Sequence, residues 1–197
     1  MRIPEAYDLG MLTETVTKKL FTRDEYHRIW DAGILPEEGR FELIRGEIIE
    51  MPPAKPPHSG RVNRLNHLFM SRLGETVIVS VQNPAIIDDF SEPSPDLTLL
   101  KPREDFYTSK HPLPEDVLLA VEISHTTVRY DSKIKAPLYA EAGIREYWQL
   151  DVKKEVLVVR TQPAEGGYLR TEVLLRGQTV RLQALPAIVF SIHEILG

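Results

Sequence analysis

The sequence predicts an α/β fold in which the core elements follow the order helix, three strands, helix, strand. The apolar run Val117–Val121 lacks alternation and is rich in Val and Leu, which is typical of a strand buried on both faces. Residues 131–143 read as a helix, and an apolar strand follows at 146–151, so the chain makes a parallel strand-helix-strand crossover. Its 197 residues, of which 42% are hydrophobic, suffice for a single domain. We expect that domain at 20–197, after an N-terminal arm at 1–19.

A helix is predicted to begin after Thr22. Thr22 followed by Glu25 three residues later forms the pattern of a capping box, in which each side chain satisfies a backbone N–H of the other. Tyr26 and Trp30 then give this helix an apolar face, and Gly33 ends it.

The next segment, 41–51, is predicted to be a β-hairpin that turns at Arg45-Gly46. A two-residue loop pairs Glu42 with Ile49, and it places both on the same face as Glu47 and Ile44. Two interpretations of these carboxylates remain open. They form salt bridges on an exposed hairpin, or one of them approaches a functional site.

The proline-rich stretch Pro52–Pro57 is predicted to be a stiff, extended linker. It brings His58 to the start of a helix, whose apolar stripe consists of Val62, Leu65, Leu68, Phe69 and Leu73. His58 is either a metal-binding or phosphate-binding group or a loop histidine without a role. Arg61 and Arg64 lie off the stripe, where they contact phosphates or water.

Two carboxylates mark the ends of apolar strands. After strands at 77–81 and 85–88, Asp96 stands at the head of Leu97–Leu100, and Glu122 closes the core strand. A carboxylate at the end of a buried strand is costly unless a cation or a donor pairs with it. Each acid therefore either caps its strand at the solvent or belongs to a site. The polar loop 101–116 is expected at the surface, where it lies over a substrate groove.

The helix after the core strand is predicted to start with Asp131 as N-cap and to end before Gly143. Its apolar arc, formed by Ile134, Leu138 and Ala142, directs Lys135 toward the sheet and Lys133 toward water. Pro137 lies too deep for the first turn, so the helix is kinked there or starts later.

The composition excludes some classes of function. The formal net charge of −5 is unlike that of proteins that bind polyanions non-specifically. There are no cysteines, so disulfides and thiolate metal sites are excluded, and no apolar run approaches 18 residues. We expect a cytoplasmic protein without a membrane role.

These residues also occur in a recognisable order. They are Pro95-Asp96, then Glu122-Ile123-Ser124, then Asp131, Lys135 and Tyr139 at intervals of four, then Gly143-Ile144 and Glu146-Tyr147-Trp148, with Phe41–Ile49 upstream. This set resembles the Uma-type putative restriction endonucleases of the PD-(D/E)XK nuclease superfamily over roughly residues 20 to 195. The parent motif has lysine where this chain has Ser124, and in the resemblance Lys135 takes over that role.

The resemblance implies a restriction-endonuclease-like core with a mixed central sheet flanked by helices. It implies a Mg²⁺- or Mn²⁺-dependent endonuclease-like phosphodiesterase that hydrolyses DNA. Asp96, Glu122 and the Ile123 carbonyl would supply oxygen ligands, which suit these cations. Lys135 would hold the attacking water, and Glu42 would be an extra acidic site residue. A homodimer is expected by analogy. The alternatives are a catalytically silent nuclease-fold module that binds nucleic acid or a protein, and a hydrolase of another phosphoester.

Overall fold

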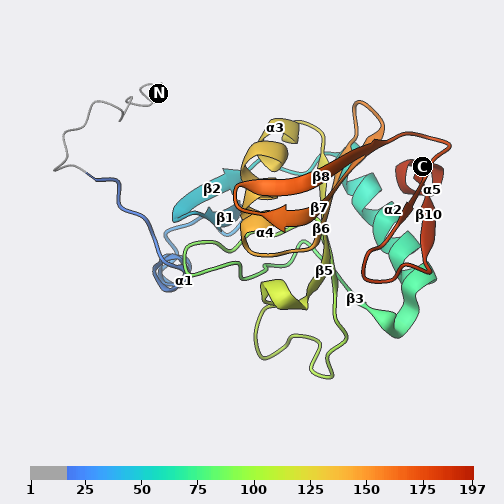
Figure 1. Ribbon diagram of the computed structural model, residues 1–197. Coiled ribbons are helices and arrows are strands. Elements are labelled where there is room, and N and C mark those ends of the chain that lie inside the picture. The colour runs from blue at the N-terminus through green and yellow to red at the C-terminus, as the bar shows by residue number, and fades with distance from the viewer. Residues whose placement is uncertain (1–16) are drawn as a thin grey trace.

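A six-stranded mixed sheet forms the centre of the molecule in the computed structural model, which describes residues 17–197 (Figure 1). The strand order is β3-β4-β5-β6-β7-β8. Only β5 and β6 run parallel, because the helical crossover joins them, and all the other neighbours are antiparallel. The strands are β3 Ile78–Val81, β4 Leu97–Leu100, β5 Val117–Ser124, β6 Glu146–Asp151, β7 Val156–Ala164 and β8 Gly167–Leu174. The predicted order of core elements and the mixed sheet are therefore confirmed.

Helices cover both faces of this sheet (Figure 1). On one face, α2 (Pro56–Leu73) and α5 (Ile192–Leu196) bury the larger apolar cluster, in which the ring of Phe69 packs against that of Trp148. On the other face, α4 (Ala136–Glu141) buries Tyr139 against Tyr147. Because β5 lies between these layers, its residues from Leu119 to Ser124 are all buried, as the unbroken apolar run predicts.

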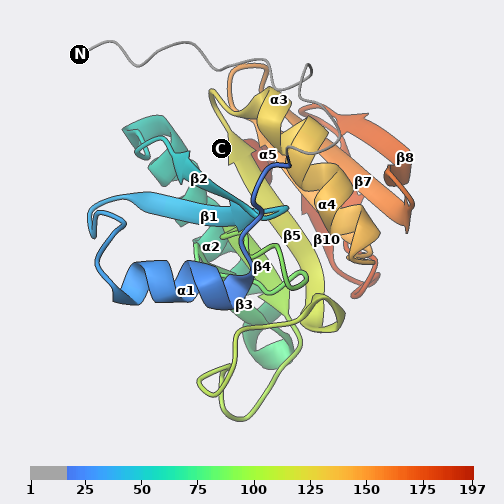
Figure 2. The ribbon, with the colours of Figure 1, turned by 90° about the vertical axis from the view of Figure 1, so that its left-hand side faces the viewer.

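The N-terminal elements form a separate layer beside the sheet (Figure 2). Helix α1 (Arg23–Asp31) begins with the predicted capping box at Thr22. The hairpin of β1 (Arg40–Ile44) and β2 (Glu47–Met51) has the predicted register, with Glu42 opposite Ile49. The Glu92 backbone N–H donates to the Leu43 carbonyl at 2.7 Å. This bond ties the hairpin to the segment that leads into β4.

The helix between β5 and β6 differs from the prediction at its start. It begins with α3 (Val128–Tyr130), continues through a π-helical turn at Asp131–Lys135, and ends with α4. The prediction that Asp131 is the N-cap is therefore wrong. The widened turn accommodates Pro137, which has no backbone N–H and whose ring would crowd the preceding turn of a regular α-helix. The predicted end is confirmed, since Gly143 has a φ of 79° just beyond the helix.

The buried face of this helix is also rotated from the predicted one. Ile134, expected on the apolar arc, is 37% exposed, whereas Lys135 and Tyr139 are buried. The predicted orientation of the two lysines is confirmed, because Lys133 is exposed. The regular 100° spacing on which the prediction depends does not hold across the π turn, which contains one extra residue.

Two further segments differ from their predictions, and a third lies far from the predicted site. Residues 85–88 form only a single bridge, between Asp88 and Ser91, and not a strand. The extended linker stops at Lys55, since α2 already begins at Pro56. The loop 101–116 lies away from both strand-end acids: it joins the end of β4 to the start of β5, whereas Asp96 precedes β4 and Glu122 lies near the end of β5. Its residues Lys101, Pro114 and Glu115 line a second pocket at that end of the sheet.

The C-terminal part adds a small two-stranded sheet. Strands β9 (Thr179–Arg181) and β10 (Val189–Ser191) pair antiparallel, and α5 follows directly with Ser191 as its N-cap. Between residues 17 and 197 no helix is long and apolar enough to cross a bilayer.

Glu146 allows a prediction about stability. Burial raises the pKa of its carboxyl, although the Gln183 and Trp148 N–H groups act to lower it. The folded protein thus holds this proton to a higher pH than the unfolded chain, whose group has an ordinary pKa of 4.5. The contribution to stability is largest below that value and is lost as the pH rises through the folded pKa. Each tenfold difference in proton affinity between the two states corresponds to a loss of about 1.4 kcal/mol.

We expect Glu146→Gln to remove this loss, because the amide cannot ionise. Urea unfolding at pH 4.5 and pH 7 measures the free energy of unfolding of the variant and of the parent protein. Parallel pH dependence in the two proteins would contradict the assignment.

Candidate active site

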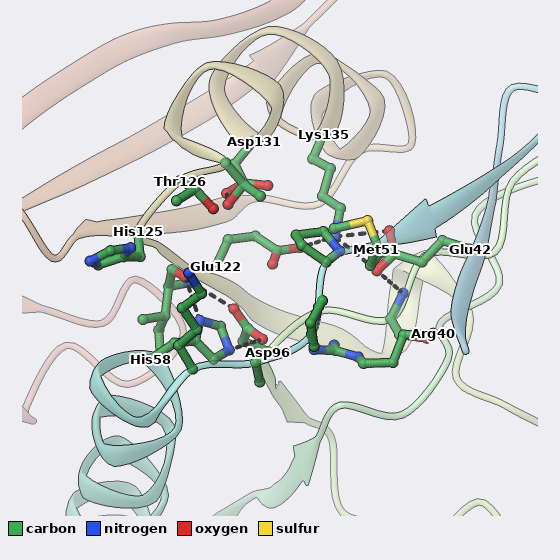
Figure 3. Close-up of a pocket in the computed structure, with 17 residues that line it drawn as sticks. Arg40, Glu42, Met51, His58, Asp96, Glu122, His125, Thr126, Asp131 and Lys135 are labelled. Atoms are coloured by element: carbon green, nitrogen blue, oxygen red, sulfur yellow. Dashed lines mark hydrogen bonds and ion pairs between the residues drawn. The ribbon is translucent and has the colours of Figure 1, made fainter. Parts of the chain in front are cut away.

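A pocket of ≈ 160 Å³ opens where the head of β4 and the end of β5 meet the hairpin, the start of α2 and the π turn (Figure 3). Each predicted site residue lies on its wall. They are Glu42 from β1, Asp96 before β4, Glu122 and Ile123 from β5, and Lys135 from the π turn. Side chains that are 93 positions apart in the chain thus share one cavity because the hairpin folds against the sheet.

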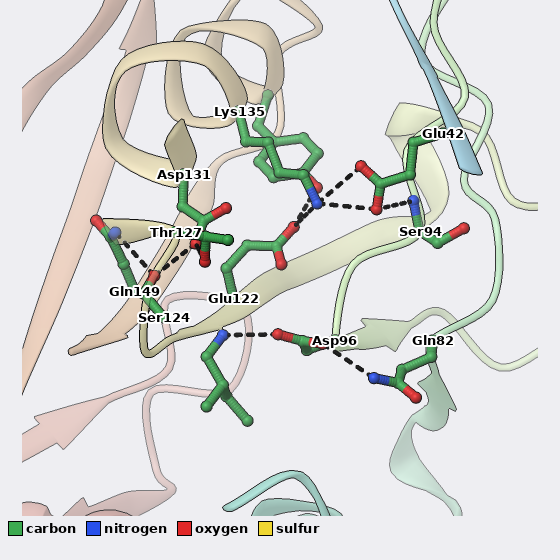
Figure 4. A network of polar contacts seen from close by, with 12 residues as sticks. Glu42, Gln82, Ser94, Asp96, Glu122, Ser124, Thr127, Asp131, Lys135 and Gln149 are labelled. Atoms are coloured by element: carbon green, nitrogen blue, oxygen red, sulfur yellow. Dashed lines mark hydrogen bonds and ion pairs between the residues drawn. The ribbon is translucent and has the colours of Figure 1, made fainter. Parts of the chain in front are cut away.

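Lys135 is the centre of a buried ionic cluster (Figure 4). Its ammonium donates to Glu122 Oε1 at 2.9 Å and to Glu42 Oε1 at 3.0 Å, and its side chain is 1% exposed. Burial alone would lower the pKa of Lys135, but the nearby carboxylates, Glu122 and Glu42 foremost, outweigh this effect and raise it. Lys135 is therefore a permanently charged hydrogen-bond donor at physiological pH.

Glu122 has two inequivalent oxygens. Oε1 accepts both from Lys135 and from the Tyr139 hydroxyl, the latter at 2.8 Å, whereas Oε2 receives neither donor. Burial raises the pKa of Glu122 well above its ordinary value; Lys135 opposes this, and Asp96 adds to it. One ammonium cannot balance several buried carboxylates, so this pocket favours a further positive charge.

Asp96 is fixed by three neighbours. Its Oδ2 accepts from the Ile123 N–H at 2.8 Å, and its Oδ1 accepts from Gln82 Nε2 at 3.1 Å. His58 Nε2 lies 3.1 Å from the same Oδ1, and His58 Nδ1 lies 2.8 Å from the Ile123 carbonyl oxygen. Burial acts to raise the pKa of Asp96, but His58 and the Ile123 N–H outweigh it, and the pKa is lowered. Asp96 is thus an anion.

A second polar chain supports the π turn (Figure 4). Asp131 Oδ2 accepts from the hydroxyls of Ser124 and Thr127, both at 2.6 Å. Ser124 in turn accepts from Gln149 Nε2 at 3.0 Å, and Gln149 also donates to the Val128 carbonyl. The Ser124 hydroxyl is therefore occupied by Asp131 and not by Glu122. This chain anchors the helix start that positions Lys135.

Sequence reasoning misses part of this arrangement. The hydroxyl of Tyr139 donates to Glu122, and the available signal is its position four residues after Lys135. The sequence leaves the role of His58 open, because its contacts depend on how α2 meets the sheet. Within residues 17–197 no three His, Asp or Glu side chains converge at metal-binding spacing. Smaller groups do occur, such as His58 beside Asp96 and the Ile123 carbonyl.

A family model described as "Uma2: Putative restriction endonuclease" matches residues 23–193 of this chain. The chain belongs to the Uma2 family. No curated protein matches it. Among solved structures, the fold is similar to a crystal structure of a putative nuclease belonging to DUF820 from Anabaena variabilis ATCC 29413. The TM-score is 0.67 at 19% identity, and the match covers 89% of this chain and 97% of that one.

The Uma2 match spans the hairpin, the core sheet and the crossover helix, so every residue of the pocket lies inside it. The structural neighbour supports the same restriction-endonuclease-like fold for almost the whole chain. The family thus gives this protein its fold and a general nuclease-like class.

Proposed function

We propose that this Uma2 protein is a metal-dependent endonuclease that hydrolyses DNA phosphodiester bonds in the pocket described above. The observation that supports it best is the convergence of one ammonium and the strand-end acids. Lys135 Nζ lies 2.9 Å from Glu122, and Asp96 lines the same cavity of ≈ 160 Å³. Structural ion pairs also occur in cores, but here the cluster opens into a pocket. Strongly shifted pKa values at such a cluster are typical of active sites.

The residues present suit a divalent cation. His58 Nε2 is buried without a hydrogen-bond partner among the described residues, and it lies beside Asp96 Oδ1. Glu122 Oε2 and the Ile123 carbonyl oxygen, which has a second lone pair, provide further oxygen atoms on the pocket wall. Asp96, Glu122 and the Ile123 carbonyl would hold Mg²⁺ or Mn²⁺. When bound, such an ion neutralises phosphate charge and lowers the pKa of bound water.

The protein's own groups would position and stabilise the reacting phosphate. Because Lys135 stays charged, it donates hydrogen bonds to the attacking water and to the phosphate oxygens, and it does not accept a proton. Glu42 holds this ammonium from the side of the hairpin. The Tyr139 hydroxyl donates a hydrogen bond to Glu122 Oε1 and so fixes the carboxylate, which leaves Oε2 available to the pocket. The site is therefore preorganised before the substrate arrives.

Substrate phosphates would meet a cationic rim. Arg40 and Lys55 also line the pocket, and Lys55 is exposed. A chain with a formal net charge of −5 has little general attraction for DNA, so these local groups would orient the strand. We expect DNA binding to involve few phosphates. Its affinity should therefore fall less steeply with salt concentration than that of a strongly basic protein.

The test uses supercoiled plasmid and single-stranded DNA with Mg²⁺, with Mn²⁺ or with EDTA. We expect nicked and linear products in both metals and none in EDTA. Glu122→Gln should abolish cleavage, and the exposed Glu50→Gln should cleave at the parent rate. DNA binding without cleavage in either metal would favour the silent nuclease-fold module, and cleavage by Glu122→Gln at the parent rate would reject the site.

A further inference from the structure

We infer that His58 is a direct ligand of the metal through Nε2, and that this nitrogen makes the site prefer Mn²⁺ over Mg²⁺. The inference rests on the metal site of the proposed function and gives it a nitrogen ligand in place of the Ile123 carbonyl oxygen, which accepts from Nδ1 on the opposite side of the same ring. It concerns the side of the pocket formed by the first turn of α2, opposite Lys135 (Figure 3).

The tautomer of His58 follows from its neighbour. Nδ1 lies 2.8 Å from the Ile123 carbonyl oxygen, which can only accept, so Nδ1 bears the hydrogen. In the neutral ring, Nε2 then presents its lone pair. Metal-binding histidines commonly have this arrangement, with the other ring nitrogen donating to a backbone carbonyl or a carboxylate.

Nε2 is also placed where it needs a cation. It is buried, it has no hydrogen-bond partner of adequate geometry among the described residues, and it lies 3.1 Å from Asp96 Oδ1. A nitrogen lone pair beside an anionic oxygen is repulsive unless a proton or a metal ion lies between the two atoms. Asp96 raises the pKa of His58, so a proton takes this place in the metal-free protein and a bound metal ion would displace it. A buried polar atom without a partner is costly, and a ligand would remove that cost.

The spacing fits shared coordination. Two adjacent ligands of an octahedral ion, each at about 2.1 Å, are about 3.0 Å apart, and the Nε2–Oδ1 distance is 3.1 Å. Oδ2 accepts from the Ile123 N–H and Oδ1 accepts from Gln82 Nε2, but Oδ1 is the oxygen beside Nε2 and it retains lone pairs that a cation can use. His58 stands at the third position of α2, after Pro56 and Pro57 restrict the backbone, so the ring is held on a rigid element.

The nitrogen donor predicts which ion the site selects. Carboxylate, carbonyl and water oxygens suit both Mg²⁺ and Mn²⁺, whereas an imidazole nitrogen is a ligand for transition-metal ions, of which Mn²⁺ is the weakest binder in the series, and not for Mg²⁺. A site built from Asp96, Glu122 and a carbonyl alone would discriminate little against Mg²⁺. With His58 included, Mn²⁺ should bind more tightly, and the preference should depend on this one side chain.

The experiment measures metal binding to the full-length protein without DNA. Mn²⁺ and Mg²⁺ affinities come from titration calorimetry, and pulsed EPR of bound Mn²⁺ detects a coordinated nitrogen. His58→Asn keeps a donor near the Nδ1 position and removes Nε2. The exposed His67→Asn, on the same helix, is the matched control. Thermal unfolding verifies that both variants fold.

We expect the affinity of His58→Asn for Mn²⁺ to be at least tenfold lower than that of the parent protein. Its affinity for Mg²⁺ should change by at most threefold, and the EPR signal of the coordinated nitrogen should disappear. His67→Asn should match the parent protein. Bound Mn²⁺ without a nitrogen signal in the parent, or an unchanged ratio of affinities in His58→Asn, would overturn this inference and leave the proposed function standing. If neither ion binds the parent protein, both proposals fail.

Discussion

Replacing Lys135 with methionine is expected to lower the free energy of unfolding by about 3 kcal/mol or more in EDTA. Methionine keeps the length of the side chain, but it leaves Glu42 and Glu122, 2% and 4% exposed, as unpaired buried carboxylates. Breaking a buried ion pair by removing one partner typically costs about 3–5 kcal/mol. Urea unfolding measures the change. Lys133→Met, an exposed lysine in the same π turn, should alter the stability by less than about 0.5 kcal/mol.

The same substitution should lower the rate of DNA cleavage by a factor of about 10²–10³, the usual effect of removing one preorganised donor at a developing charge. Unfolding of the variant would also lower the rate of cleavage. The triple variant Lys135→Met, Glu42→Gln, Glu122→Gln therefore tests the effect of the unpaired charges on stability alone. It should recover most of the stability, because no buried charge is left without a partner. A Lys135→Met protein that is folded and cleaves DNA at the parent rate would remove Lys135 from the mechanism.

Asp96→Asn is expected to abolish the stabilisation of the protein by Mn²⁺. At a metal concentration of 100 times the dissociation constant, binding adds about 2.7 kcal/mol to the free energy of unfolding. The amide oxygen can still accept from the Ile123 N–H, so the local fold should persist, but the anionic charge that holds the cation is lost. Thermal shifts with and without Mn²⁺ measure the effect.

The matched control for this substitution is Asp89→Asn, whose side chain is 87% exposed in the same acidic segment. It should keep the full metal-induced shift. An equal shift in Asp96→Asn and in the parent protein would show that the ion binds elsewhere.

The sequence predicted the elements whose patterns are local. The unbroken run of β5, the capping box at Thr22 and the turn at Arg45-Gly46 each depend on neighbouring residues, and the structure confirms all three. The position of Asp96 and Glu122 at strand ends followed from the same patterns. That the two ends face one pocket follows from the antiparallel pairing of β4 with β5.

The unpredicted features depend on tertiary packing. No local pattern distinguishes a π turn from an α-helix, and Pro137 indicated only that the regular geometry fails somewhere near it. The place of His58 depends on the angle at which α2 crosses the sheet, and the bond from Tyr139 to Glu122 depends on the rotation of a helix around that π turn. Side-chain contacts across layers are set by packing and not by sequence periodicity.

The π turn at Asp131–Lys135 contains one residue more than a regular helical turn. Because of this extra residue, the amine of Lys135, and not the aliphatic side chain of Ile134, points toward Glu122. If the same residues were wound as an ordinary α-helix, every later side chain would be rotated by about 100° relative to the residues before the turn. The exposed Ile134 is the immediate neighbour of the lysine in the chain. A change that rewinds this turn as a regular helix would therefore carry the amine of Lys135 away from Glu122 and bring Ile134 toward the sheet in its place.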